Sequence, residues 1–167
     1  SGQQAVTLGT LSLADNTGVA SNYSLTSATL DINAKPISLT GTKVYDALTT
    51  AASGDLSISG TVGGQNLSLT GNGTLSSGSD VGTNKTINTS GLTLGNGSGG
   101  SAGIASNYSL VGGTYQMTVT KRPVTINGSR FYDSTTIASS SDITAFNNTA
   151  GGQSLTITGA GSVATAV

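Results

Sequence analysis

The sequence predicts a mainly β protein made of small tandem modules, and three observations lead to this prediction. Val, Ile and Leu alternate with Ser and Thr over many short stretches, which is the period-two pattern of half-buried strands. Gly is abundant, with 25 of 167 residues, and interrupts these stretches as turn residues do. Long segments recur at a nearly constant separation, which indicates repetition of one structural unit with at most one short helical turn.

Charged residues are sparse, which limits the classes of partner. Six Lys and Arg stand against seven Asp, with a net charge of −1, so no basic cluster is available for nucleic acid or an anionic membrane. No apolar run reaches the roughly 18 to 20 residues that a membrane-spanning helix needs. The low charge also disfavours disorder. We expect a soluble piece of a longer protein, without nucleic-acid binding or membrane insertion.

The first third of the chain contains three expected strand regions. Residues 5–13 alternate on either side of Gly9 and predict two short strands or one bulged strand. Residues 23–32 alternate again. Residues 36–41 form the third region, and Pro is acceptable at its first position because the missing N–H lies outside the ladder.

Further strands are expected in the rest of the chain, separated by short loops. The small residues of 47–53 favour one helical turn at most. A turn at Gly63-Gly64 joins two strands, and a Gly/Ser loop covers 95–103. The expected strands lie around Leu56 and Ile58, Leu67 and Leu69, Ile87, Leu92 and Leu94, and over 108–119.

An internal repeat organises these strands. The hexapeptide at 20–25 returns at 105–110, 85 residues later. Residues 123–128 copy 36–41 at a separation of 87, and 151–159 copy 63–71 at a separation of 88. A constant separation across unrelated motifs goes beyond what a Ser, Thr and Gly bias produces.

The repeat predicts the domain boundaries. Residues 35–120 form one complete module, residues 1–34 match the C-terminal part of a module, and residues 121–167 match the N-terminal part of the next. The alternative phase divides the chain into 1–76 and 77–167. In the first phase, exposed strand edges should remain at both ends, where they invite pairing with another chain.

Five short motifs occur in a fixed order within the complete unit. They are Gly41-Thr42-Lys43-Val44-Tyr45-Asp46, Gly63-Gly64-Gln65, Val81-Gly82-Thr83-Asn84-Lys85, Gly91-Leu92-Thr93-Leu94 and Ala105-Ser106-Asn107-Tyr108-Ser109-Leu110. These motifs resemble those of YDG-type modules, which are related to the MBG domains of large bacterial surface exoproteins. The resemblance implies small β-grasp-like or sandwich-like modules that act as spacers in haemagglutinin-like, two-partner-secreted adhesins at the cell surface.

One position departs from the family pattern. The glycine that follows Tyr-Asp in the family is Ala47 here and Ser134 in the second copy. Gly at this position would suit a turn residue with positive φ. We therefore expect that the turn does not need this geometry in the present copies.

The residues selected from these motifs are expected to be structural. In each Tyr-Asp pair the ring should pack inward while the Asp begins an Asx turn. The tyrosines of the two hexapeptides should anchor a small core, with the hydroxyl group reaching a backbone partner. The selected residues are Tyr23, Tyr45, Asp46, Tyr108, Tyr132 and Asp133.

Catalysis and metal binding find no support. The chain has no His, Cys or Glu, and its seven Asp are scattered, whereas a calcium loop needs several carboxylates within about a dozen residues. A nucleophilic Ser or Thr would need an adjacent base. The Gly-rich stretch 95–100 lacks the Gly-Lys-Ser/Thr ending of a phosphate loop. We expect no enzyme activity, no metal and no cofactor.

Two functions and two architectures stay open. The first function is a spacer or stalk repeat of a bacterial surface adhesin, whose partners are neighbouring modules and, through the parent protein, a host or matrix glycan or protein. The alternative is a carbohydrate- or matrix-binding module that uses loops such as 95–103. A parallel β-helix is the competing architecture, although its rungs should repeat every 20 to 30 residues or so.

Overall fold

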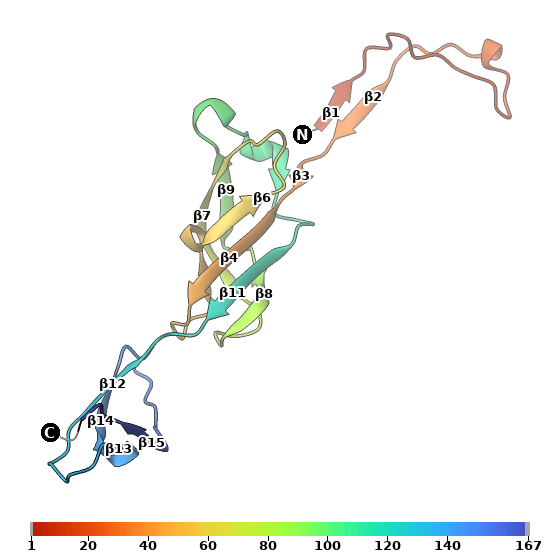
Figure 1. The fold of residues 1–167 in the computed structure, drawn as a ribbon. Helices are drawn as coiled ribbons and strands as arrows, with labels where there is room; N and C mark the ends of the chain where they lie inside the picture. Colours follow the sequence, from red (N-terminus) through yellow and green to blue (C-terminus); the bar gives the residue numbers. More distant parts are fainter. Residues whose placement is uncertain (1, 166–167) are drawn as a thin grey trace. The chain divides into compact units, whose positions relative to one another are not determined.

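The structure, a computed structural model, describes residues 2–165 as a mainly β protein (Figure 1). These residues form fifteen strands and five 3-10 turns of three residues each. The mainly β class predicted from the alternating pattern is confirmed. Among the described residues, no helix is long and apolar enough to cross a membrane.

The largest sheet contains seven strands in the order β5-β7-β8-β11-β4-β6, with β9 paired to β7. The pairs β5–β7, β7–β8 and β8–β11 are antiparallel. A parallel β-helix would need parallel rungs, so that alternative is wrong for this sheet. The strands are β4 (Ser38–Val44), β5 (Thr50–Ala52), β6 (Leu56–Ser59), β7 (Leu67–Leu75), β8 (Gly82–Asn88), β9 (Leu92–Asn96) and β11 (Tyr115–Thr120).

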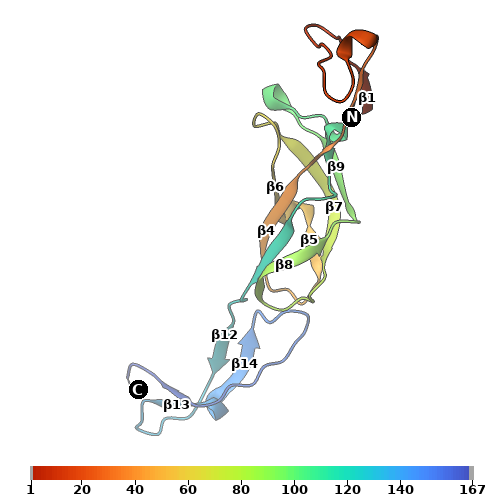
Figure 2. The same ribbon diagram turned by 90° about the vertical axis from the view of Figure 1, so that its right-hand side faces the viewer.

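The connection between β5 and β6 requires this sheet to curl. The two strands end the strand order, yet only the 3-10 turn η2 (Ser53–Asp55) joins them. The four residue steps from Ala52 to Leu56 span at most about 15 Å. Outer strands of a flat sheet six strands wide would lie roughly 24 Å apart. The sheet therefore bends toward a barrel, as the ribbon views show (Figures 1 and 2).

Gly41 allows β4 to pass close to the turn between β5 and β6. A Cβ at this residue would lie 2.3 Å from the carbonyl oxygen of Asp55 and 2.8 Å from a methyl carbon of Leu56. No side chain fits at that distance. The same close approach recurs at Gly128, where a Cβ would lie 2.1 Å from the carbonyl oxygen of Asp142.

The N-terminal region forms one antiparallel pair, β1 (Gly2–Ala5) with β2 (Thr29–Ile32). A long loop with the 3-10 turn η1 (Ala20–Asn22) connects them (orange in Figure 1). The strands predicted over 5–13 are wrong beyond Ala5. An alternating pattern does not make a strand without a backbone partner, and the structure records no ladder for residues 6–13.

A short parallel pair, β3 (Lys35–Pro36) with β10 (Tyr108–Ser109), accompanies the large sheet. The turns η3 (Gly99–Ser101) and η4 (Ala105–Asn107) precede β10. Together with η2, residues 35–120 thus hold three single 3-10 turns where at most one was expected. All three turns consist of small residues, Gly, Ala and Ser, with one Asp or Asn in η2 and η4.

The C-terminal region forms two antiparallel pairs. β12 (Thr125–Gly128) pairs with β14 (Ile143–Asn147), and β13 (Ile137–Ser139) pairs with β15 (Ala160–Ser162). A capping box formed by Ser139 and Asp142 fixes the start of η5 (Ser140–Asp142). These sheets and the β1–β2 sheet have only two strands, so each strand keeps an unpaired edge among the described residues.

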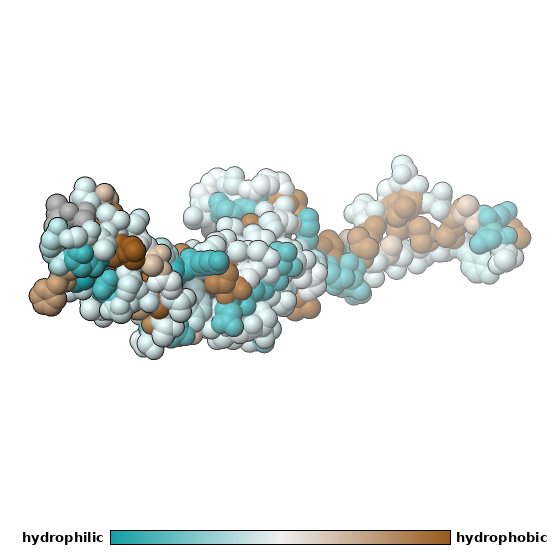
Figure 3. All heavy atoms as spheres, turned by 60° about the horizontal axis from the view of Figure 1, so that its bottom comes forward, coloured by the Kyte–Doolittle hydropathy of each residue, from teal (hydrophilic) through white to brown (hydrophobic). Residues whose placement is uncertain are grey.

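The buried apolar residues mark where the core lies. All but Ala150 belong to residues 35–120, and they are Ile37, Leu39, Ala51, Leu75, Ile87, Leu92, Tyr108, Met117, Val119 and Ala150. Many apolar side chains of 2–34 and 121–165 are exposed (brown in Figure 3). The predicted module boundaries stay a prediction, although the core coincides with the unit predicted to be complete.

The chain divides into two compact units, each composed of three separate stretches. The first unit comprises 1–39, 58–70 and 93–114, and the second comprises 40–57, 71–92 and 115–167. The pocket around Tyr108 belongs to the first unit, and both Tyr-Asp segments belong to the second.

Candidate functional site

The first Tyr-Asp corner, residues 43–48, is held by Asp46. Its Oδ1 accepts the backbone N–H of Leu48 at 3.0 Å and lies 2.8 Å from Nζ of Lys43. Lys43 is buried and also donates to the carbonyl oxygens of Leu48 at 3.1 Å and Thr50 at 2.8 Å. The ammonium group therefore has three acceptors, which a buried charge requires.

The second Tyr-Asp corner, residues 130–135, has the same construction 87 residues later. Nη1 of Arg130 lies 2.8 Å from Oδ2 of Asp133, and Oδ1 of Asp133 accepts the N–H of Thr135 at 3.0 Å. Each Asp thus bonds the N–H two residues on, the mark of an Asx turn. The Asx turns predicted at Asp46 and Asp133 are confirmed.

The residue after each Tyr-Asp pair contradicts the prediction made for it. Ala47 has φ of 66° and Ser134 has φ of 62°, so both occupy the left-handed region. The expectation that these copies do not need a positive φ is therefore wrong. The Asx turn and the basic residue at the start of each corner fix the backbone in this conformation, which the family's glycine would adopt without strain.

The pKa values of Asp46 and Asp133 are both lowered, so each carboxyl group stays ionised to a lower pH than usual. Burial acts to raise the pKa of Asp46, but the hydrogen bonds from Lys43 and Leu48 and the charge of Lys43 outweigh it and lower the pKa. At Asp133 the backbone N–H of Thr135 is the main cause of the lowered pKa. Each carboxylate thus acts as a hydrogen-bond acceptor for its turn, which is a structural role.

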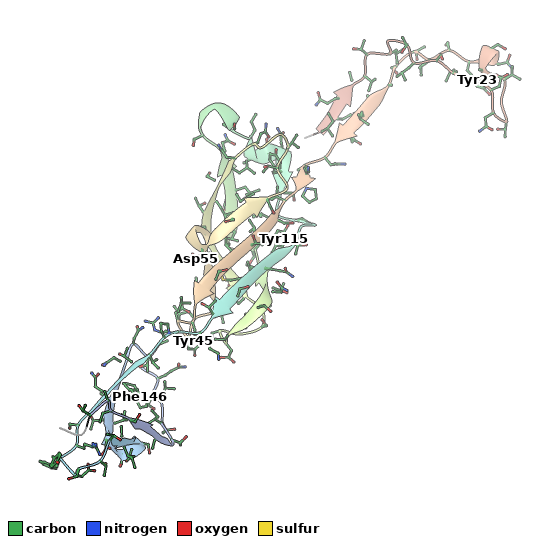
Figure 4. The ribbon with its side chains drawn as sticks, in the orientation of Figure 1. Tyr23, Tyr45, Asp55, Tyr115 and Phe146 are labelled. Atoms are coloured by element: carbon green, nitrogen blue, oxygen red, sulfur yellow. The ribbon has the colours of Figure 1, made fainter. Side chains whose placement is uncertain are left out.

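Tyr45 is half-buried, and its ring lines a pocket of about 240 Å³ together with residues of 121–155. It stands at the end of β4 (Figure 4). Its hydroxyl oxygen lies 2.9 Å from Nε2 and 3.1 Å from Oε1 of Gln153. The expected inward packing of Tyr45 is corrected: the ring contacts the following copy of the repeat.

The turn that presents Gln153 is a Gly-Gly-Gln turn, residues 150–153. Gly151 and Gly152 have φ of 56° and 68°, and the N–H of Gln153 bonds the carbonyl oxygen of Ala150 at 3.0 Å. Two successive positive φ angles define a type I′ turn. A Cβ at Gly151 would lie 3.2 Å from the methyl group of Ala47, so the turn lies against the first corner.

Arg122 ties the same junction together. Its Nε and Nη2 donate to the carbonyl oxygen and Oδ1 of Asn148, at 2.7 and 2.6 Å. Its Nη1 lies 3.4 Å from the carbonyl oxygen of Tyr45. One guanidinium group therefore bonds the backbone at the end of β4 and the segment just before the Gly-Gly-Gln turn.

Tyr108 fulfils the prediction made for it. The residue is 6% exposed, and its hydroxyl group accepts the N–H of Val62 at 3.1 Å. The same hydroxyl group donates to Oε1 of Gln65 at 2.5 Å. Gln65 belongs to the first Gly-Gly-Gln turn, residues 62–65, where Gly63 and Gly64 again have positive φ.

Tyr23 does not form the expected anchor. The residue is 70% exposed and lies beside η1, away from the strands (Figure 4). In the described residues, the two Gly-Gly-Gln turns bond the hydroxyl groups of Tyr108 and Tyr45, so neither turn covers the ring of Tyr23. Tyr132 is likewise 71% exposed, because nothing in the described residues plays the part that Gln153 plays for Tyr45.

The sequence reasoning gave no role to four residues that make these contacts. Gln65 and Gln153 occupy the same place in the repeat and bond a tyrosine hydroxyl group in each case. Lys43 and Arg122 satisfy backbone carbonyl groups beside the first corner. The retention of Gln at a separation of 88 within otherwise variable Ser, Thr and Asn was the available signal.

The corners, the turns and the tyrosine–glutamine contacts stabilise the fold, and they do not form a recognisable catalytic or metal-binding site. Within residues 2–165, no three side chains of the metal-binding types come together. Every buried side-chain nitrogen and oxygen in the described part has a hydrogen-bond partner. What the geometry repeats is a corner, a turn and a tyrosine bonded to a glutamine.

Comparison with known proteins gives one match. The family model described as the YDG domain matches residues 31–119, more than half of the chain. The match includes the first Tyr-Asp corner, the first Gly-Gly-Gln turn and Tyr108. No curated protein and no solved structure matches the chain.

Proposed function

Because the chain belongs to the YDG domain family, we propose that it is a structural spacer repeat of a bacterial surface adhesin. In this proposal the repeat projects an adhesive region away from the cell and has no catalytic role. Its partners are the neighbouring copies in the same polypeptide, and the protein acts outside the cell. The similarity to modules of surface exoproteins supports the location.

The contact of Tyr45 and Ala47 with the following Gly-Gly-Gln turn carries this proposal. A spacer must limit bending where one copy meets the next. Only Lys121 and Arg122 separate β11 from Pro123, and Arg122 is bonded to both sides of the junction. Short junctions fixed by side-chain hydrogen bonds stiffen a chain, whereas Gly/Ser linkers leave it flexible.

Small-angle X-ray scattering of a chain that carries several consecutive repeats tests the proposal. A stiff spacer gives a cross-sectional scattering regime and a maximum dimension that grows linearly with the number of copies. Flexibly jointed copies give dimensions that grow more slowly, near the square root of copy number. The second result would exclude a spacer role.

Exposed aromatic side chains favour a second candidate, a carbohydrate- or matrix-binding module. Phe131 and Tyr132 are neighbours in the chain and both are largely exposed. Exposed aromatic rings with one polar end are common at binding surfaces. A glycan array probed with the intact chain tests this role, and reproducible binding that is lost in Phe131→Ala would support it over the spacer.

A further inference from the structure

The structure contains two versions of one pocket. The first, of about 510 Å³, includes Lys35, Val62 and Gln65 in its lining, and the second includes Arg122, Ala150 and Gln153. These residues are pairwise equivalent in the repeat, at separations of 87 or 88. The second pocket contains the ring of Tyr45, whereas no tyrosine of a Tyr-Asp corner lines the first.

The side chains that line the second pocket, which contains the ring of Tyr45, are more buried than their equivalents in the first pocket. Ala150 is 6% exposed, while its equivalent Val62 is 56% exposed. A Cβ at Gly151 would meet Ala47 at 3.2 Å, whereas a Cβ at Gly63 would meet nothing within 4 Å among the described residues. The two Gly-Gly-Gln turns thus have the same backbone shape. A Tyr-Asp corner covers the second turn, and none covers the first among the described residues.

The two glutamines present the same amide group to different tyrosines. Oε1 of Gln65 accepts from Tyr108. Nε2 of Gln153 donates to the hydroxyl oxygen of Tyr45 at 2.9 Å, and Oε1 of Gln153 lies 3.1 Å from the same oxygen. A glutamine amide has both an acceptor and two donors, so one side chain can bond two tyrosines at once.

We propose that each Gly-Gly-Gln turn is a two-sided clamp between copies, and that the pocket at Gln65 receives the Tyr-Asp corner of the preceding copy of this repeat. Oε1 of the glutamine accepts from the tyrosine of its own copy, as at Tyr108. Nε2 donates to the corner tyrosine of the copy before it, as at Tyr45. The corner also covers the exposed Val62 side chain. The inference rests on the proposed role as a repeated spacer and specifies how neighbouring copies are joined.

The chain itself supplies a corner of the required kind. Tyr132 is equivalent to Tyr45 and is 71% exposed. Joining two complete chains head to tail places residues 121–167 directly before residues 1–34, which together are slightly shorter than one repeat. Inserting residues 80–87 at the joint restores the separation of 108 residues that lies between Tyr45 and Gln153. In this linked chain, Tyr132 of the first copy precedes Gln65 of the second by the same 108 residues.

Cysteine cross-linking tests the placement, since the chain has no cysteine of its own. Tyr132→Cys in the first copy and Gln65→Cys in the second should be joined by a short bis-maleimide. The matched control replaces the neighbouring Phe131 by Cys, with Gln65→Cys kept. We expect a yield roughly tenfold or more above the control, because docking raises the local concentration of the two thiols. Equal yields would overturn the proposal.

The single chain calibrates the method. Tyr45→Cys with Gln153→Cys should cross-link with similar efficiency, since the structure places these side chains in contact. Failure of this pair would remove the template on which the proposal stands.

Side-chain amide resonances give a second test that keeps the glutamines intact. The linked chain should show two Gln65 side-chain signals in a ¹⁵N–¹H spectrum, one from each copy, where the single chain shows one. Tyr132→Phe in the first copy should merge them, because it removes the hydroxyl group that accepts from Nε2. A single unshifted signal in the linked chain would overturn the clamp.

These outcomes are separable from the spacer role. Linear growth in scattering without cross-linking would keep the spacer and refute the clamp. Cross-linking with flexible scattering would keep the clamp and refute the spacer.

Discussion

Residues 35–120, predicted to be a complete copy, and the flanking segments 2–34 and 121–165, predicted to be partial copies, share sequence but differ in what they bury. Met117 and Val119 of β11 are each 1% exposed. Leu30 and Ile32 hold the same places in the repeat and are both more than half exposed. The difference comes from the covering strands, because β2 has only β1 beside it while β11 lies inside a seven-stranded sheet.

Local geometry survives in the partial copies although the core does not. The C-terminal region keeps the positive φ after Tyr-Asp, the type I′ turn, the Asx turn and the close approach at Gly128. These features depend on hydrogen bonds between residues near in sequence. Burial depends on partners that are distant in sequence. Apart from Ala150, the buried apolar residues therefore lie within residues 35–120, which hold the seven-stranded sheet.

Replacing the glycine at the close approach should give the largest difference in unfolding free energy between residues 35–120 and residues 121–165. Gly41→Ala would place a Cβ 2.3 Å from the Asp55 carbonyl oxygen, and we expect it to lower the free energy of unfolding of the core by about 4 kcal/mol. Gly128→Ala meets the same obstacle outside the core and should change this value by less than about 0.5 kcal/mol. Urea unfolding monitored by near-ultraviolet circular dichroism measures both.

An equal loss in the two glycine variants would change the comparison. It would show that residues 121–165 unfold together with the core, despite the exposure of their apolar side chains. The partial copy would then be part of one cooperative unit.

Truncating an apolar side chain of β11, or its equivalent on β2, should give the next largest difference. Met117→Ala removes a fully buried side chain and should cost about 3 kcal/mol of unfolding free energy. Leu30→Ala changes the equivalent but exposed residue and should cost less than about 0.5 kcal/mol. The same urea transition reports both. A cost for Leu30→Ala close to that of Met117→Ala would mean that β2 is covered in solution.

Relieving the left-handed residue after Tyr-Asp should stabilise the protein. Ala47 has φ of 66°, and Ala47→Gly should raise the unfolding free energy by about 1 kcal/mol. Thermal unfolding by circular dichroism measures the gain. Ser134→Gly is the matched change in the partial copy and should leave the core transition unchanged. A destabilised Ala47→Gly protein would indicate that the methyl contact with Gly151 outweighs the backbone strain.

The sequence predicted features that depend on residue type and spacing. It predicted the β class, the Asx turns at Asp46 and Asp133 and the buried Tyr108 with its backbone partner. Each follows from local chemistry or from a repeated motif.

Features that depend on distant partners escaped prediction. Tyr23 and Tyr108 lie in the same hexapeptide, but only Tyr108 is covered by the Gly-Gly-Gln turn at residues 62–65. The positive φ of Ala47 and Ser134 could not be inferred from side chains that disfavour it. The pairing of Gln153 with Tyr45 links residues 108 positions apart and became visible only in three dimensions.

The pH dependence of stability should show the smallest difference between the two corners. Because the folded-state pKa of Asp46 lies below its ordinary value, its stabilising effect is complete above that value and is lost as the pH falls through the lowered folded pKa. Asp46→Asn should therefore reduce stability near neutral pH, with the reduction shrinking in strong acid. The side chain is 37% exposed, so solvent screening keeps the effect below about 1 kcal/mol.

Asp133→Asn changes the exposed corner and should leave the core transition the same at every pH. The measurement is urea unfolding of both variants and the parent chain from neutral pH to below the ordinary pKa of aspartate. A pH-independent loss in Asp46→Asn would mean that the Asx hydrogen bond, which an asparagine oxygen can replace only in part, matters more than the charge pair with Lys43.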